Sequence, residues 1–196
     1  MNIMKKIIMI AAMAVMSVAA MAQDFKFGYV DFNELIMLMP EMDEARAAIE
    51  ENQKTNEEIL MTMYQEYQKK MQEYEQKNAT WTPAVREMKE KELMQLQQNL
   101  EQNQQVLQQE LQQLQQQLQA PIYEKAQKAV NELAKSKGLA VVFEKNSLLY
   151  LDPAQGTDLT PEARTALNIP ADRTLEKLQQ EMQAKMQAAQ TAAQAQ

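Results

Sequence analysis

The residue types that carry most enzyme chemistry are scarce in this sequence. The chain of 196 residues has no His, no Cys and only three Gly, so the commonest metal ligands, thiol nucleophiles and imidazole bases are absent. Two carboxylate pairs remain as candidates for acid–base catalysis, Asp31 with Glu34 and Glu57 with Glu58. Neither pair lies in a predicted pocket or beside an obvious partner, so we interpret them as solvated or capping carboxylates. The sequence therefore predicts a protein that is not an enzyme, with no catalytic residues and no metal site.

Binding chemistry is better represented, because methionine and aromatic side chains interrupt otherwise polar runs. Methionine is flexible and polarizable, which suits it to contacts with many partners. Six residues are candidates for binding a partner: Met61, Tyr64, Trp81, Val85, Met88 and Met94. Packing within the chain is the alternative for each of them. The only tryptophan, Trp81, either contacts a partner from an exposed turn or holds that turn by packing on Val85 or Lys77.

The segments that position these side chains are two long predicted helices, at 41–78 and 83–120. In both, apolar residues fall mostly three or four positions apart, which places a narrow stripe on one face of a helix. Thr82 followed by Pro83 is typical of a helix start. Equal arms about a tip at 78–83 predict an antiparallel hairpin roughly 55–60 Å long. The predicted hairpin seam contains Ile49, Met63, Tyr67, Leu96, Leu100, Leu107, Leu111 and Leu114. Ile59, Asn52, Asn56 and Asn103 also fall on the stripe.

The first 22 residues predict a secretory signal peptide in preference to a membrane anchor. Lys5 and Lys6 precede an apolar run that is short for a membrane span, and Ala20-Met21-Ala22 fits a cleavage site before Gln23. Loss of the two lysines lowers Lys plus Arg from 20 to 18 against 27 acids, for a mature net charge of −9. Residues 41–120 hold 15 of the acids and 8 of the bases. This acidic surface argues against nucleic-acid binding, and we expect no stable membrane insertion.

The remaining mature residues, 23–40 and 121–168, predict a small body of three strands and short helices. The strands are predicted at 26–32, 139–144 and 147–151, the last two joined as a β-hairpin through Lys145 and Asn146.

The ends of several helices are also marked in the sequence. The second arm is predicted to bend at Pro121 and to end at Gly138, and a short helix is predicted after Thr160 as its N-cap. Residues 169–196 predict an Ala/Gln-rich C-terminal tail that begins as helix and ends frayed or disordered.

The predicted strands favour an oligomer, because they are apolar on both faces and one chain leaves two open sheet edges. Closing the sheet with copies of the chain removes those edges, and three chains would supply about nine strands for a small barrel. The fold class is therefore predicted as α+β, with a small barrel-like trimerisation body and one long antiparallel coiled-coil hairpin per chain. The residues expected in the oligomeric body are Phe27, Tyr29, Val30, Val141, Phe143, Leu149 and Leu151.

At this point the sequence resembles the Skp/OmpH family of periplasmic chaperones for outer-membrane proteins. The resemblance is carried by Phe27-Gly28-Tyr29-Val30-Asp31, the long hairpin, Ala120-Pro121-Ile122, residues 137–143, the 148–152 strand and Asp158-Leu159-Thr160, behind a signal peptide. It implies a homotrimer in which helical tentacles surround a cavity, and a holdase that binds unfolded outer-membrane β-barrel proteins and prevents their aggregation. It also implies action without ATP or another cofactor.

Two features depart from the family pattern. Family members have strongly basic arms whereas these are acidic, which puts lipopolysaccharide binding in doubt, and the tail beyond Ile169 exceeds the family core. The alternative function is a structural coiled-coil adaptor that binds a folded partner in the cell envelope.

Overall fold

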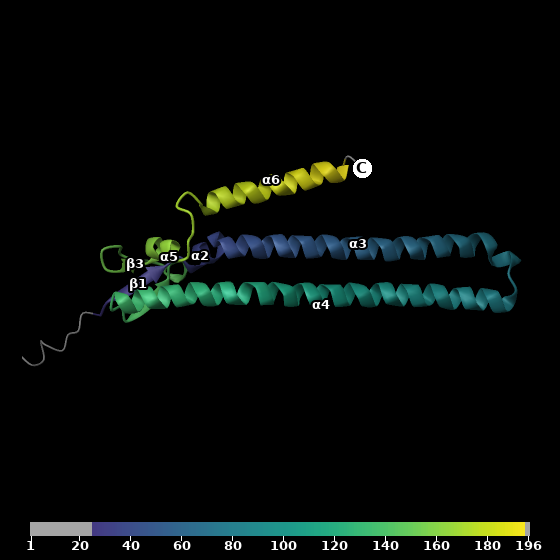
Figure 1. The fold of residues 1–196 in the computed structure, drawn as a ribbon, viewed down its shortest axis with the longest axis horizontal. Helices are drawn as coiled ribbons and strands as arrows, with labels where there is room; N and C mark the ends of the chain where they lie inside the picture. Colours follow the sequence, from purple (N-terminus) through teal and green to yellow (C-terminus); the bar gives the residue numbers. More distant parts are fainter. Residues whose placement is uncertain (1–24, 195–196) are drawn as a thin grey trace, which may run out of the picture. The chain divides into compact units, whose positions relative to one another are not determined.

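The structure is a computed structural model that describes residues 25–194, and the predicted signal peptide lies outside the described residues. The chain divides into two compact units: a hairpin unit, Met39–Glu124, and a body made of the chain up to Leu38 and from Lys125 onward. The elements, most of them labelled in Figure 1, are β1 (Phe27–Val30), α2 (Phe32–Leu38), α3 (Pro40–Lys77), η1 (Asn78–Thr80), α4 (Pro83–Ser136), β2 (Val141–Glu144), η2 (Lys145–Ser147), β3 (Thr157–Asp158), α5 (Thr160–Ala166) and α6 (Leu175–Gln194).

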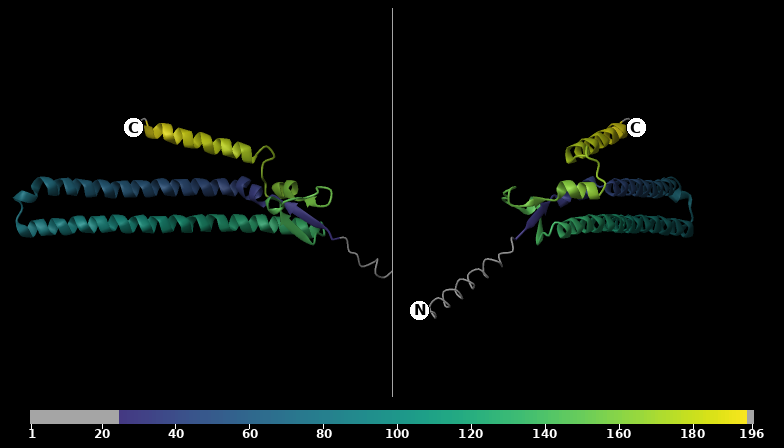
Figure 2. Two further views of the ribbon diagram at one scale, coloured as in Figure 1. Left: turned by 180° about the vertical axis from the view of Figure 1, so that it is seen from behind. Right: turned by 60° about the vertical axis from the view of Figure 1, so that its left-hand side comes forward.

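The hairpin unit consists of α3 and the first part of α4, which run antiparallel and side by side (Figures 1 and 2). Their sequences are rich in Gln, Glu, Lys, Leu and Met, all good helix formers. Pro40 occupies the first turn of α3, where its missing N–H costs nothing. The Thr82 hydroxyl accepts a hydrogen bond from the Val85 amide at 3.4 Å, which confirms the predicted cap of α4. The same helix continues through Pro121.

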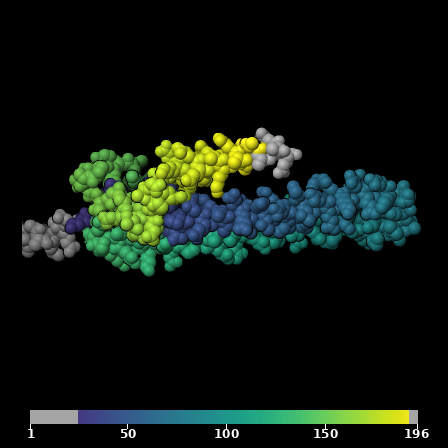
Figure 3. Space-filling view, turned by 45° about the horizontal axis from the view of Figure 1, so that its top comes forward, coloured from purple at the N-terminus to yellow at the C-terminus, as the bar shows by residue number. Residues whose placement is uncertain are grey.

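The packing between the two arms is thin. Half-buried positions recur every three or four residues along both helices, whose outer face Figure 3 shows in space-filling form. The buried apolar residues of the hairpin unit are few: Met39, Met42, Ala45, Leu93 and Ile122. The predicted place of Ile59 on the stripe is wrong, because its side chain is 41% exposed. Leu60 is half-buried instead, since steps of four, three and four residues from Asn56 reach Leu60, Met63 and Tyr67.

The body contains a three-stranded parallel sheet in the order β2-β1-β3. The central strand carries Gly28, and a Cβ there would lie 2.7 Å from Leu139 Cδ1 and 3.1 Å from the Thr157 carbonyl oxygen. The neighbouring strand and loop therefore approach β1 closely at a position where only glycine leaves room.

The third strand is not where the sequence placed it. The predicted β-hairpin needs a tight turn with positive φ, and neither Lys145 nor Asn146 has one. Residues 145–147 form a 3₁₀ turn instead, and the chain leaves the sheet through Leu149, which is fully exposed. It returns at β3, which pairs with β1.

The body core is apolar and surrounds the short helices. Its fully buried large side chains include Leu35, Leu38, Leu159 and Leu167. Gly138 has φ of 63°, and the Leu139 amide donates to the Ala134 carbonyl at 3.0 Å, which confirms the predicted glycine end of α4.

One prediction for the C-terminal part of the body is wrong: Thr160 is the first residue of α5 and not its N-cap, and its hydroxyl accepts the Asp31 amide at 3.0 Å. Beyond Asn168, whose φ is 57°, the chain forms helix α6, which agrees with the predicted helical start of the tail and continues to Gln194. The fraying expected at the end of the tail stays a prediction.

Candidate functional site

The tip of the hairpin unit is held by its own side chains. Trp81 is half-buried and packs edge-on against Tyr74, with ring centroids 5.9 Å apart. The guanidinium of Arg86 donates to the Asn78 carbonyl through Nε at 3.2 Å and Nη2 at 3.0 Å. The arginine satisfies a backbone carbonyl at the C-terminal end of α3, where the 3₁₀ turn begins, and the contact with Tyr74 holds the ring of Trp81. They favour packing within the chain for Trp81, although Tyr74 replaces the expected Val85 or Lys77.

A charged cluster links the two helices just behind this tip. Lys70 of α3 forms an ion pair with Glu92 of α4, and Lys89 donates to the same carboxylate at 3.1 Å. The hydrogen bonds from both lysines lower the pKa of Glu92, and the bond to Glu92 raises the pKa of Lys70. The Tyr74 hydroxyl of α3 likewise donates a hydrogen bond to Glu90 of α4, which raises the pKa of the phenol. The charges thus reinforce the register of the hairpin near its end.

Four of the six predicted binding residues are exposed. Met61 is 63% exposed, Tyr64 52%, Met88 56% and Met94 58%, whereas Val85 is half-buried like Trp81. At about 100° per residue, Met61 projects roughly opposite to the half-buried Met63. The exposed residues therefore lie on several sides of the two helices. Such a set offers separate, weak apolar contacts and no formed pocket.

Two further exposed apolar residues of α4 were not singled out from the sequence, Tyr123, which is 48% exposed, and Val106. Val106 is 42% exposed and lies 18 residues, or five helical turns, after Met88 on α4. The two side chains consequently project from the same side of the helix. A single Val within a Gln-rich run forms no repeat of its own. Its separation of 18 residues from Met88 would nevertheless have predicted that both side chains lie on the same side of the helix.

The residues predicted for the hairpin seam are partly shielded from solvent, and their contact across the hairpin stays a prediction. Ile49, Met63, Tyr67, Leu96, Leu100, Leu107, Leu111 and Leu114 are all half-buried.

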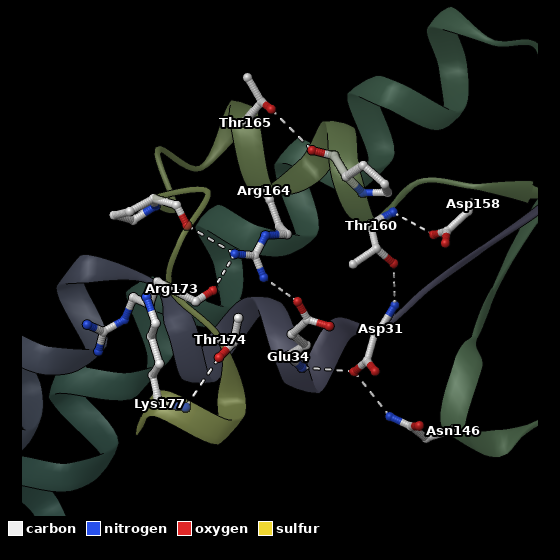
Figure 4. Close-up of polar contacts among 12 residues, drawn as sticks. Asp31, Glu34, Asn146, Asp158, Thr160, Arg164, Thr165, Arg173, Thr174 and Lys177 are labelled. Atoms are coloured by element: carbon white, nitrogen blue, oxygen red, sulfur yellow. Dashed lines mark hydrogen bonds and ion pairs between the residues drawn. The ribbon is translucent and has the colours of Figure 1, made fainter. Parts of the chain in front are cut away.

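The carboxylates considered for catalysis have structural surroundings. Asp31 accepts the Glu34 amide at 2.9 Å, as an N-cap does, and also the Asn146 side chain at 3.1 Å (Figure 4). Glu34 forms an ion pair with Arg164 of α5. Glu57 and Glu58 are exposed on α3. Among residues 25–194 no cluster of metal-ligating side chains is placed to hold an ion, and no helix is both long and apolar enough to cross a bilayer.

The residues predicted for the oligomeric body fall into two groups. Tyr29 and Val30 are 8% and 3% exposed, so they belong to the core of the single chain, while Phe27, Val141 and Leu151 are half-buried. Phe143 is 39% exposed and Leu149 is fully exposed. The sequence did not single out Phe25, 69% exposed, or Tyr150, 84% exposed, which add to the second group.

Comparison with known proteins identifies the family. The model of the family described as outer membrane protein (OmpH-like) matches residues 26–167. The chain belongs to the OmpH-like family. Among solved structures it is similar to that of a proposed OmpH-like outer membrane chaperone from Caulobacter crescentus, with a TM-score of 0.65 at 13% sequence identity. The match covers 76% of this chain and 89% of that one, and at this identity it shows a shared fold. No curated protein matches the sequence.

Membership of the OmpH-like family agrees with the resemblance seen in the sequence, and it leaves α6 outside the matched residues. The candidate functional surfaces are accordingly the exposed methionines of the hairpin unit and, separately, the exposed apolar residues of the body.

Proposed function

We propose that this protein is a periplasmic holdase chaperone, which binds unfolded outer-membrane β-barrel proteins between helical arms and prevents their aggregation without ATP. Its family membership supports a chaperone role, and the similar protein from Caulobacter crescentus carries the same proposed description. The observation that carries the proposal is the exposure of Met61, Tyr64, Met88 and Met94, each above one half, on an otherwise polar hairpin. Large apolar side chains held in water on polar helices suit transient contact with apolar polypeptide.

Binding on this proposal depends on many weak contacts acting together. No pair of these methionines forms one wide apolar face, so each contact with a client is small. Several arms around one client would raise the effective concentration of such contacts and give useful affinity without a tight site. The acidic charge of the arms keeps the complex soluble.

We further propose that the arms are assembled as a homotrimer through the body. Leu149 is fully exposed and Tyr150 is 84% exposed, beside a parallel sheet whose outer strands have open edges. Parallel sheets are ordinarily covered on both faces, and exposed edges favour pairing with other chains. Copies of the body would cover these apolar side chains, and Phe25 and Phe143 with them.

The structural adaptor remains the second candidate, because a long hairpin with a fixed tip also suits docking to a folded envelope protein. It would bind one partner at fixed stoichiometry and ignore unrelated unfolded chains.

The test dilutes a urea-unfolded outer-membrane β-barrel protein into buffer with residues 23–196 and follows light scattering, with the mass of the complex measured alongside. A holdase suppresses scattering and gives about three chains per client. Unchanged scattering at excess protein would refute the proposal and favour the adaptor.

A matched pair of variants assigns the activity to the hairpin. Replacing Met61, Tyr64, Met88 and Met94 together with Gln keeps good helix formers and removes the apolar side chains. The control replaces four exposed glutamines of the same helices with Ala: Gln65, Gln72, Gln98 and Gln102. We expect only the first variant to lose suppression of aggregation.

A further inference from the structure

The C-terminal segment lies beyond the family match, and an arginine of α5 helps to hold it against the body. Arg164 Nη2 donates to the Pro170 carbonyl at 3.0 Å and to the Arg173 carbonyl at 2.5 Å, while its Nη1 pairs with Glu34 (Figure 4). Close by, Leu178 of α6 is only 4% exposed, and α6 contacts α2. The start of α6 is therefore part of the packed body.

The buried face of α6 continues into solvent. Its large apolar residues are Leu175, Leu178, Met182 and Met186, at steps of three, four and four, so they share one side of the helix. Leu178 is buried, but Met182 is 44% exposed and Met186 is 58% exposed. One apolar stripe thus begins inside an intramolecular interface and extends out of it over about two further turns.

The small area of this exposed stripe argues against a second copy of the chain as its occupant. Stable protein–protein interfaces bury about 1,200–2,000 Å², which two partly exposed methionines with Ala and Gln neighbours cannot provide. The segment 175–194 is also electrically balanced, with two acids and two bases, in contrast to the acidic arms. A short, neutral, methionine-bearing stripe suits an extended apolar segment of varying sequence.

We propose that α6 is an additional client-binding arm, on which Met182 and Met186 contact apolar segments of unfolded polypeptide. This inference rests on the proposed holdase function and assigns a role to a segment outside residues 26–167. The anchor at Arg164 supports it, because a helix already ordered by the body loses less conformational freedom on binding than a loose tail would.

The experiment measures the affinity of the full mature chain for a dye-labelled, urea-unfolded outer-membrane β-barrel protein by fluorescence anisotropy. The double variant Met182→Gln and Met186→Gln should raise the Kd roughly threefold to tenfold, because it removes two apolar contacts among several. The control, Gln180→Ala and Gln187→Ala, alters exposed residues on the other side of α6 and should leave the Kd unchanged. Replacing both methionines with Leu keeps the stripe apolar and should preserve affinity.

The possible outcomes separate this inference from the function on which it rests. An unchanged Kd for the Gln variant, while the fourfold hairpin variant binds weakly, would overturn the role of α6 and leave the holdase intact. Absence of binding by the unaltered protein would overturn both. Sedimentation provides a second reading: a change in assembly mass with the Gln variant would show that the stripe joins copies of the chain, which also contradicts the proposal. Circular dichroism confirms that α6 remains helical in each variant.

Discussion

Arg164 provides the sharpest test of how the C-terminal segment is held. Its guanidinium reaches three acceptors at once: the Glu34 carboxylate and the carbonyl oxygens of Pro170 and Arg173. Replacing it with Ala removes all three hydrogen bonds. The main consequence should be local release of residues 169–194 and not global unfolding, because the body core around Leu35 and Leu159 is untouched.

The size of the effect follows from the bonds that opening would break. Hydrogen bonds to charged groups contribute about 1.5–3 kcal/mol each. Two of them join Arg164 to the released segment, so we expect the opening free energy to fall by about 2–3 kcal/mol after discounting for non-additivity. Each 1.4 kcal/mol is about a tenfold change. The open form should therefore become roughly 30- to 100-fold more populated. The Glu34 side chain is 24% exposed and can turn to water, which limits the penalty of leaving it without the arginine.

Limited trypsin digestion measures this opening directly, because Arg173 is itself a cleavage site within the released segment. We expect cleavage between Arg173 and Thr174 to accelerate in proportion to the open population when reclosing is fast. The control is Lys137→Ala, which breaks a 2.7 Å ion pair with Glu162 whose side chains are 30% and 51% exposed; such pairs contribute about 0–1 kcal/mol. Equal cleavage rates at Arg173 in the Arg164→Ala variant and the unaltered protein would refute the anchoring role.

Three further predictions concern the sheet, the tip and the assembly. Gly28→Ala should lower the free energy of unfolding in urea by about 1–3 kcal/mol, because its Cβ would lie 3.1 Å from the backbone carbonyl oxygen of Thr157 and would also displace the Leu139 side chain; an unchanged midpoint would contradict this close approach. The pKa of Glu92 is lowered from 4.5, so its stabilisation of the tip is present above that value and is lost as the pH falls through the folded pKa. Acidification should therefore change the fluorescence of Trp81, the only tryptophan, as Glu92 is protonated. Glu92→Gln should abolish this change, and a change that persists in the variant would belong to another titrating group. Replacing Leu149 and Tyr150 with Asp should reduce the assembly mass in sedimentation, whereas an unchanged mass would exclude these side chains from the interface.

The helical arms were the most predictable part of the molecule, because their signals are local. Thr82 and Pro83 marked the start of α4, and the repeat of apolar residues every three or four positions marked the face between the helices. Only the predicted burial of Ile59 was wrong. Leu60 beside it is equally apolar, and the repeat alone does not determine which of the two side chains faces the other helix. The exposed Met61 and Met94 were identified because they break this repeat.

The body was less predictable, because its contacts are made between distant parts of the chain. Strand β3 has two residues, too few for any periodic pattern, and its position depends on the Leu159 amide donating to the Tyr29 carbonyl at 2.9 Å. The apolar run at 147–151 satisfied every local criterion for a strand but does not join the sheet of a single chain. Arg164 likewise gave no signal, since its partner Glu34 lies 130 residues away.

The thin packing between the two arms and the exposure of the methionines have the same physical cause, because the apolar face of each arm is narrow. Asn52, Asn56 and Asn103 are half-buried on the stripe, and all three form hydrogen bonds within their own helices: Asn56 donates to Asn52 at 3.1 Å and Asn103 to the Asn99 carbonyl at 2.8 Å. Such positions add little apolar burial between the arms, so local stability there should be low. A thicker core would require wider apolar faces, which would draw side chains such as Met61 into the seam. On the proposed function, weakly packed arms can adjust to clients of different size at small cost in free energy, while the polar, acidic surface keeps both arms and client in solution.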